Sequence, residues 1–149
     1  MSAEAELDEF LGRFLPEVAE RAGAVIAALR LQLPGAMILV YDNYNALAVG
    51  FGPNEKTRAI ALSIAVYPRW VSLFLAGGSY LDDPHGLLKG EGNTVRHVVL
   101  QAAEDIHDPR IQALIGQAVA RCEPPIADTP PGSMIIKSVS AKQRPRRPA

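Results

Sequence analysis

Apolar residues near both ends of the chain recur every three or four positions, which is the spacing of one face of an α-helix. One stripe covers residues 7–14 and a second covers residues 18–33. Pro16 separates them, and because proline fits the first turn of a helix, we expect two helices that meet there. A third stripe covers residues 111–122 and follows Asp108, whose carboxylate suits a helix N-cap.

The residues between these helices follow a different pattern. Short apolar runs, separated by turn-forming Asp, Asn, Gly and Pro, predict five strands, at 37–41, 46–51, 59–67, 69–75 and 94–100. Connections this short favour antiparallel pairing, because a parallel crossover needs a dozen or more residues. The sequence therefore predicts an α+β fold: a two-layer sandwich of an antiparallel sheet of about five strands with N- and C-terminal helices.

The chain after residue 123 differs in composition from the rest. It begins with prolines, which are typical of a linker, and a later apolar run predicts an edge strand at 133–140. We therefore divide the chain into a domain of residues 1–123 and a Pro-rich, basic tail of residues 124–149. We expect the last residues, 143–149, to be mobile when the protein is isolated from any partner.

Charge is divided unevenly along the chain. Residues 130–149 hold five of the 15 basic residues and none of the 16 acidic ones, so this segment carries +5 and the remainder −6. A basic tail on an acidic body indicates either contact with nucleic acid or another anionic surface, or packing of the tail against its own body. Five charges are few for an arm that follows a phosphate backbone, which favours the second interpretation.

Three features of the sequence bear on compartment. The single cysteine, Cys122, cannot form an intramolecular disulfide. The first 14 residues are acidic and amphipathic, whereas a signal peptide begins with basic residues. The apolar runs are too short to span a bilayer. We therefore expect a cytoplasmic protein without a membrane partner.

Aromatic residues near the ends of the predicted strands are the best candidates for a ligand site. Apolar surfaces with a few converging polar groups are typical of small-molecule pockets. The candidate residues are Tyr41, Asn43, Tyr44, Tyr67, Arg69, Trp70 and Arg96. The alternative is that these tyrosines and the tryptophan close an ordinary core, with their polar tips at the surface.

A second cluster of chemically active residues lies in the turn-rich segment before the last strand. Asp82, Asp83 and His85 are close enough in sequence to hold a divalent metal ion. However, an Asp-Asp-Pro-His-Gly segment is more often a simple turn.

Three runs of sequence resemble the YdhG-like bacterial domain family, a family first labelled a domain of unknown function. They are YDNYNALAVGF at 41–51, IAVYPRWVSLF at 64–74, and LLKGEG at 87–92 followed by VRH at 95–97. The resemblance implies an α-β-α arrangement similar to that of frataxin. One branch of the family is described as frataxin-like iron chaperones that supply iron–sulfur cluster assembly.

Iron binding is implied here by this resemblance alone. Frataxin-type binding uses exposed carboxylates, since hard iron prefers oxygen ligands. The corresponding candidates are Glu4, Glu6, Asp8 and Glu9 on the first predicted helix. The alternative is a solvated helix face whose acids are enriched near the N-terminus, where they interact favourably with the helix dipole.

The sequence carries no recognisable catalytic triad, metal-ligand cluster or nucleotide-binding fingerprint. We therefore expect a non-catalytic binding protein, either a frataxin-like iron carrier or a module that docks on a protein partner. One alternative is a small-molecule-binding protein or an enzyme that uses the aromatic region near Tyr41, Tyr44 and Trp70. Another is nucleic-acid contact through the basic tail.

Overall fold

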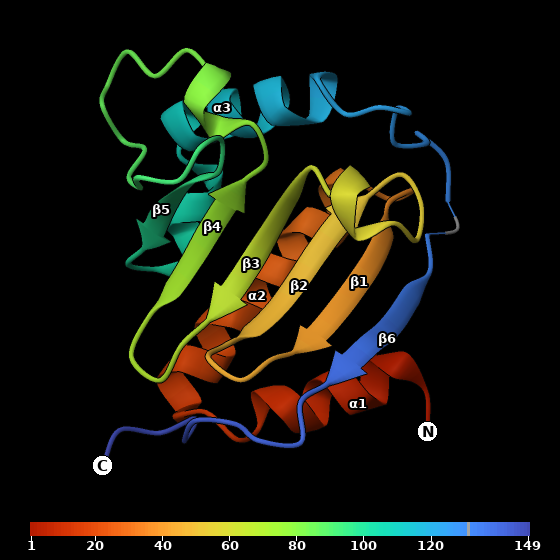
Figure 1. Cartoon of the computed structure of the whole chain (residues 1–149), viewed down its shortest axis with the longest axis vertical. Helices are drawn as coiled ribbons and strands as arrows, with labels where there is room; N and C mark the ends of the chain where they lie inside the picture. The colour runs from red at the N-terminus through yellow and green to blue at the C-terminus, as the bar shows by residue number, and fades with distance from the viewer. Residues whose placement is uncertain (131) are drawn as a thin grey trace.

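A computed structural model describes residues 1–130 and 132–149 (Figure 1). Pro131, part of the linker predicted after residue 123, lies outside the described residues. The helices are α1 (Ala3–Leu11), α2 (Pro16–Gln32) and α3 (Pro109–Ala120). The strands are β1 (Met37–Asp42), β2 (Leu47–Gly52), β3 (Leu62–Val66), β4 (Val71–Leu75), β5 (Arg96–Leu100) and β6 (Met134–Val139). The predicted α+β class is confirmed, and the sixth strand of the sheet, β6, lies at its edge and within the range 133–140 of the predicted edge strand.

The six strands form one mixed sheet in the order β5-β4-β3-β2-β1-β6. Strands β1 to β5 pair antiparallel with their neighbours, as the short connections predict. The expectation of an entirely antiparallel sheet is wrong for β6, which pairs parallel with β1. The physical reason is that β6 returns from the far side of α3 through a long connection, and such a connection permits parallel pairing.

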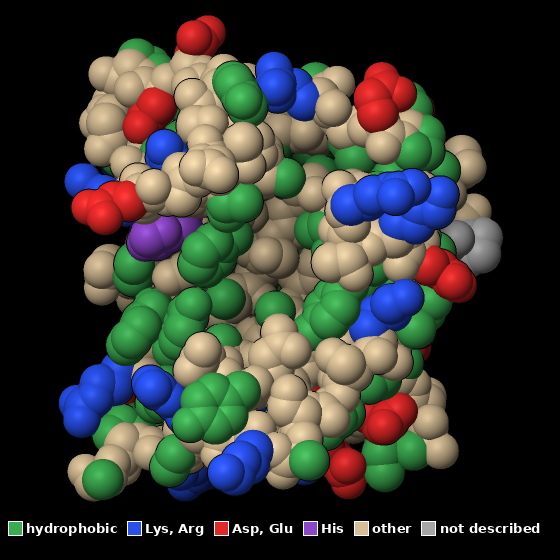
Figure 2. Space-filling model, viewed as in Figure 1, with side chains coloured by type: hydrophobic (Ala, Val, Ile, Leu, Met, Phe, Trp, Pro, Cys, Tyr) green, Lys and Arg blue, Asp and Glu red, His purple; other side chains and the backbone are tan. Residues whose placement is uncertain are grey.

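The helices and one face of the sheet share a single hydrophobic core. Alternate residues of a strand point to opposite faces, and in β2 the core-facing ones are Leu47, Val49 and Phe51. Leu7 of α1 and Ile115 of α3 belong to the same core. Figure 1 shows α2 behind the sheet, so the opposite face is the one toward the viewer. Figure 2 shows that this face is hollowed at its centre.

The two helix boundaries predicted from proline are confirmed. Pro16 is the first residue of α2, and Pro109 is the first residue of α3. Asp108 caps α3, because its side chain accepts a hydrogen bond from the backbone N–H of Arg110. None of the helices in the described part of the chain is long and apolar enough to cross a membrane.

The segment that follows β6, residues 140–148, is here called the C-terminal strap. It crosses the lower end of the view in Figure 1, from β6 toward the turn between β3 and β4. Backbone N–H groups of Ser140 and Arg144 donate to the carbonyl oxygens of Asp42 and Tyr44, both at 2.9 Å. The strap is thus placed against the body, with Arg146 buried, and the expectation that residues 143–149 are mobile in isolation stays a prediction.

Candidate functional site

A groove of about 650 Å³ lies between the turn that joins β3 to β4 and the C-terminal strap. We call it the aromatic–arginine groove. Its lining residues are Asn45, Tyr67, Pro68, Arg69, Trp70, Arg144, Pro145, Arg147 and Pro148. Figure 2 shows hydrophobic and basic side chains next to one another at this end of the molecule. Both a hairpin of the sheet and the last residues of the chain therefore contribute to the groove.

Two aromatic rings form one wall of this groove. Tyr67 follows β3 and Trp70 precedes β4, and the backbone N–H of Tyr67 donates to the carbonyl oxygen of Trp70 at 2.9 Å. This tight turn stacks the two rings, with centroids 4.7 Å apart and planes 17° from parallel. Burial raises the pKa of the Tyr67 hydroxyl. Trp70 keeps 41% of its surface exposed, so a planar group can reach its ring.

Three arginines give the groove its charge. Arg69 comes from the β3–β4 turn, while Arg144 and Arg147 come from the strap. Arg144 lies over the ring of Tyr44 at 5.6 Å, and Nε of Arg147 donates to the carbonyl oxygen of Arg13 at 3.1 Å. In residues 1–130 and 132–149, none of these three guanidinium groups forms an ion pair with a carboxylate. Since no acidic residue lines the groove either, it is a positively charged surface.

A buried ion pair holds the strap in place beside the groove. Nη2 of Arg146 donates to Oδ1 of Asp42 at 2.8 Å, and the side chains are 5% and 1% exposed respectively. Asp42 also pairs with Arg13 at 3.3 Å. The guanidinium of Arg146 lies 5.8 Å from the centre of the Phe14 ring. The interpretation that the basic tail packs against its own body is therefore confirmed at Arg146.

The structure brings together only part of the predicted ligand site. Tyr67, Arg69 and Trp70 line the groove, and Tyr44 lies next to it beneath Arg144. Asn43 contributes its backbone carbonyl oxygen, which accepts a hydrogen bond from Arg146. The charged residues that the sequence interpretation missed are Arg144 and Arg147. The opposite charges of tail and body were the one signal that could have placed the two arginines there.

Two of the predicted residues lie outside the groove. The hydroxyl of Tyr41 is hydrogen-bonded to the hydroxyl of Thr57 in the β2–β3 connection. Nη1 of Arg96 donates to the carbonyl oxygens of Gly92 and Val95, at 2.6 and 2.8 Å. Arg96 thus secures the loop before β5, which is a structural role.

The acidic residues suggested as iron ligands all lie on α1. Glu4, Asp8 and Glu9 are exposed, and Glu6 is partly exposed. Across the described residues, no three His, Cys, Asp or Glu side chains gather closely enough to hold a metal ion. The iron-carrier hypothesis remains a prediction from the family resemblance.

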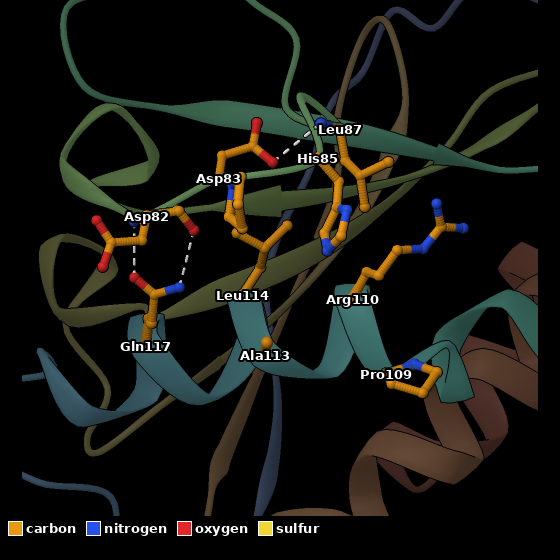
Figure 3. Close-up of a pocket in the computed structure, with 10 residues that line it drawn as sticks. Asp82, Asp83, His85, Leu87, Pro109, Arg110, Ala113, Leu114 and Gln117 are labelled. Carbon is orange, nitrogen blue, oxygen red and sulfur yellow. Dashed lines mark hydrogen bonds between the residues drawn. The ribbon is translucent and has the colours of Figure 1, made fainter.

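A smaller cavity of about 310 Å³ contains the Asp82, Asp83 and His85 cluster, between the loop before β5 and α3 (Figure 3). We call it the loop cavity. Both carboxylate oxygens of Asp83 accept backbone N–H groups, from Leu87 and Leu88, at 2.9 Å each. The backbone of Asp82 exchanges two hydrogen bonds with the side chain of Gln117, at 2.8 and 3.0 Å. These contacts favour the turn interpretation of this segment over the metal one.

The rim of the loop cavity carries an exposed ion pair between Arg110 and Asp108. Nη2 of Arg110 lies 2.7 Å from Oδ2 of Asp108, and Nε lies 3.1 Å from Oδ1. Hydrogen bonds from the Arg110 side chain and backbone lower the pKa of Asp108 to about 2. His85 lies beside Arg110 in Figure 3 and adds a smaller charge effect in the same direction.

Comparison of the chain with protein-family models, with curated proteins and with solved structures found no match. The resemblance to the YdhG-like family therefore stays a prediction. The function has to be argued from the groove itself.

Proposed function

We propose that the protein is a non-catalytic binding protein whose aromatic–arginine groove holds a small ligand with a planar ring and an anionic group. Nucleotides are the nearest chemical class. The observation that carries the proposal is the stacked Tyr67–Trp70 pair beside arginines that have no carboxylate partner among the described residues. We place this role in the cytoplasm, because the use of a single cysteine is typical of a reducing compartment.

The two kinds of side chain suit the two parts of such a ligand. An exposed tryptophan face that is already fixed by stacking offers a rigid platform for a planar ring. Guanidinium groups donate two parallel hydrogen bonds to a phosphate or carboxylate, and this geometry adds both energy and orientation. A volume of about 650 Å³ is in the range of ordinary small-molecule sites.

The composition of the lining favours binding over catalysis. General acid–base catalysis uses a group that exchanges a proton near neutral pH, most often histidine or a carboxylate. The groove is lined instead by arginine, proline, asparagine, tyrosine and tryptophan. Arginine stays protonated, and the raised pKa of Tyr67 keeps its hydroxyl protonated as well.

The experiment uses Trp70, which is the only tryptophan in the chain, so its fluorescence reports on the groove alone. The probe is AMP, with adenosine and inorganic phosphate as its two separate halves. We expect saturable quenching by AMP and at least tenfold weaker binding of either half, because each half engages only one kind of contact. The absence of saturable quenching by AMP at millimolar concentration would overturn the proposal.

Two variants locate the binding site. Arg69→Ala removes one hydrogen-bonding cation, and we expect the dissociation constant of AMP to rise about tenfold, since hydrogen bonds to charged groups contribute 1.5–3 kcal/mol as a rough measure. The matched control is Arg30→Ala, which removes an exposed arginine from the last turn of α2, outside the groove. Equal weakening by both variants would indicate non-specific attraction to positive charge.

A further inference from the structure

The aromatic–arginine groove has one wall that belongs to the sheet and one that does not. Tyr67, Arg69 and Trp70 lie on the rigid turn between two paired strands. Arg144 and Arg147 lie on the C-terminal strap, which has no secondary structure of its own beyond β6. The geometry of the groove therefore depends on how firmly the strap is attached to the body.

Arg146 is the residue that attaches it. The guanidinium groups of Arg144 and Arg147 belong to the lining of the groove, whereas that of Arg146 is turned into the protein and reaches Asp42. It also donates to the backbone carbonyl oxygens of Asn43 and Tyr44, in the turn between β1 and β2. This side chain thus joins the strap to the end of β1 and to the β1–β2 turn, which belong to the same sheet as the β3–β4 turn that forms the other wall. Gln143 adds a hydrogen bond from its side-chain amide to the carbonyl oxygen of Asp42 at 3.0 Å.

The ion pair that attaches the strap adds little net stability. The free energy needed to remove two charges from water nearly equals the free energy gained from their attraction. Nε of Arg146 is buried and has no hydrogen-bond partner among the described residues, which adds a further cost. Among the described residues, the other hydrogen bonds from the strap to the body come from the backbone N–H groups of Ser140 and Arg144 and from the side chains of Gln143 and Arg147, and all of them end on backbone carbonyl oxygens. The docked state is therefore favoured by a modest margin, which the loss of Arg146 can remove because it leaves the buried carboxylate of Asp42 without this partner.

We infer that Arg146 is a positioning residue for the groove and that the strap is coupled to ligand binding through it. The inference rests on the function proposed above. A ligand that contacts both walls binds only the docked strap, so occupancy of the groove stabilises the Arg146–Asp42 pair. By linkage, release of the strap weakens ligand binding by the same factor. Arg146 acts without touching the ligand.

The first part of the test needs no ligand. It measures the rate at which trypsin cleaves the Lys142–Gln143 bond, by mass spectrometry of the intact protein. Arg144 and Arg147 each precede a proline, so trypsin leaves those bonds intact, and Lys142–Gln143 is the strap site shared by all variants. We expect Arg146→Ala to be cleaved about tenfold faster than the wild type, because the released strap is accessible to the protease. Arg144→Ala removes the same charge from an exposed side chain, and we expect a change of less than about threefold.

The second arm measures coupling with AMP as the probe. We expect AMP to slow cleavage of the wild-type strap but not of Arg69→Ala at the same AMP concentration, and Arg146→Ala to raise the AMP dissociation constant about tenfold. If Arg146 had only a structural role, Arg146→Ala would lower the helical circular dichroism signal and the thermal midpoint. The AMP dissociation constant and the protection of the strap by AMP would then be unchanged. If AMP binds the wild type but neither protects the strap nor depends on Arg146, the inference is overturned and the proposed function stands. If AMP does not bind, the proposed function and the coupling fall together, and the ligand-free arm still decides whether Arg146 anchors the strap.

Discussion

The loop cavity and the aromatic–arginine groove use polar side chains in opposite ways. In the loop cavity, Asp83 is satisfied by two backbone N–H groups, and Arg110 by the carboxylate of Asp108. In the aromatic–arginine groove, the three arginines have no carboxylate partner among the described residues. Charged groups that are already neutralised by a partner hold the chain in place, whereas arginines without a carboxylate partner are available to an anionic ligand. The loop cavity is therefore structural, and the groove is the candidate binding site.

The largest test of this contrast is Leu114→Ala in the loop cavity. Leu114 is 3% exposed and belongs to both the cavity wall and the core. We expect the free energy of unfolding in urea to fall by about 3 kcal/mol, because the substitution leaves a cavity in a packed site. AMP affinity should not change. The control is Leu31→Ala, which truncates a leucine that is 85% exposed and should cost less than about 0.5 kcal/mol.

An intermediate effect is expected for Asp83→Ala. The substitution leaves two part-buried backbone N–H groups, of Leu87 and Leu88, without their acceptor, and we expect a loss of about 1–2 kcal/mol in urea unfolding. Asp82→Ala is the control, because Asp82 uses only its backbone in the hydrogen bonds with Gln117. Stabilisation of the wild-type protein by Zn²⁺, but not of Asp83→Ala, would show that the carboxylate is a metal ligand. The interpretation of the loop cavity as structural would then be wrong.

The smallest expected effect concerns pH and the Asp108–Arg110 pair. The pKa of Asp108 is lowered in the folded protein, from 3.8 to about 2. Its contribution to stability is therefore present above pH 3.8 and is lost as the pH falls through about 2. We expect Asp108→Asn to flatten the decline of the urea midpoint over this window, and Arg110→Ala to flatten it as well, since it removes the cause of the shift. A decline that stays equally steep in both variants would show that other groups produce it.

Local patterns in the sequence predicted most of the elements, because helix and strand periodicity are properties of neighbouring residues. The residue spacing in 7–33 gives both N-terminal helices, and Pro109 after Asp108 gives the start of α3. The parallel pairing of β6 with β1 was not predictable in this way. It joins Leu39 to Ile135 across most of the length of the chain, and nothing in either strand specifies the other as its partner.

The candidate site was predictable only on one side. Tyr67, Arg69 and Trp70 share a short turn, so their proximity follows directly from the sequence. Arg144 and Arg147 reach them because Arg146 is buried against Asp42, and a basic residue in a proline-rich tail is ordinarily read as solvated. The opposite charges of the tail and the body indicated that the two attract one another. They could not indicate which residues of the body the tail contacts.

The position of β6 has a consequence for synthesis of the chain. Until residues 134–139 leave the ribosome, β1 is the edge strand of a five-stranded sheet, and its sequence MILVYD carries no basic residue to discourage pairing with another chain. The strand that finally covers it has Lys137 at its centre and an irregular register beside Val40 and Tyr41. Both are features that protect a sheet edge from further pairing. A ribosome that stalled before residue 134 would therefore hold a nascent chain that is more prone to aggregate than the finished protein.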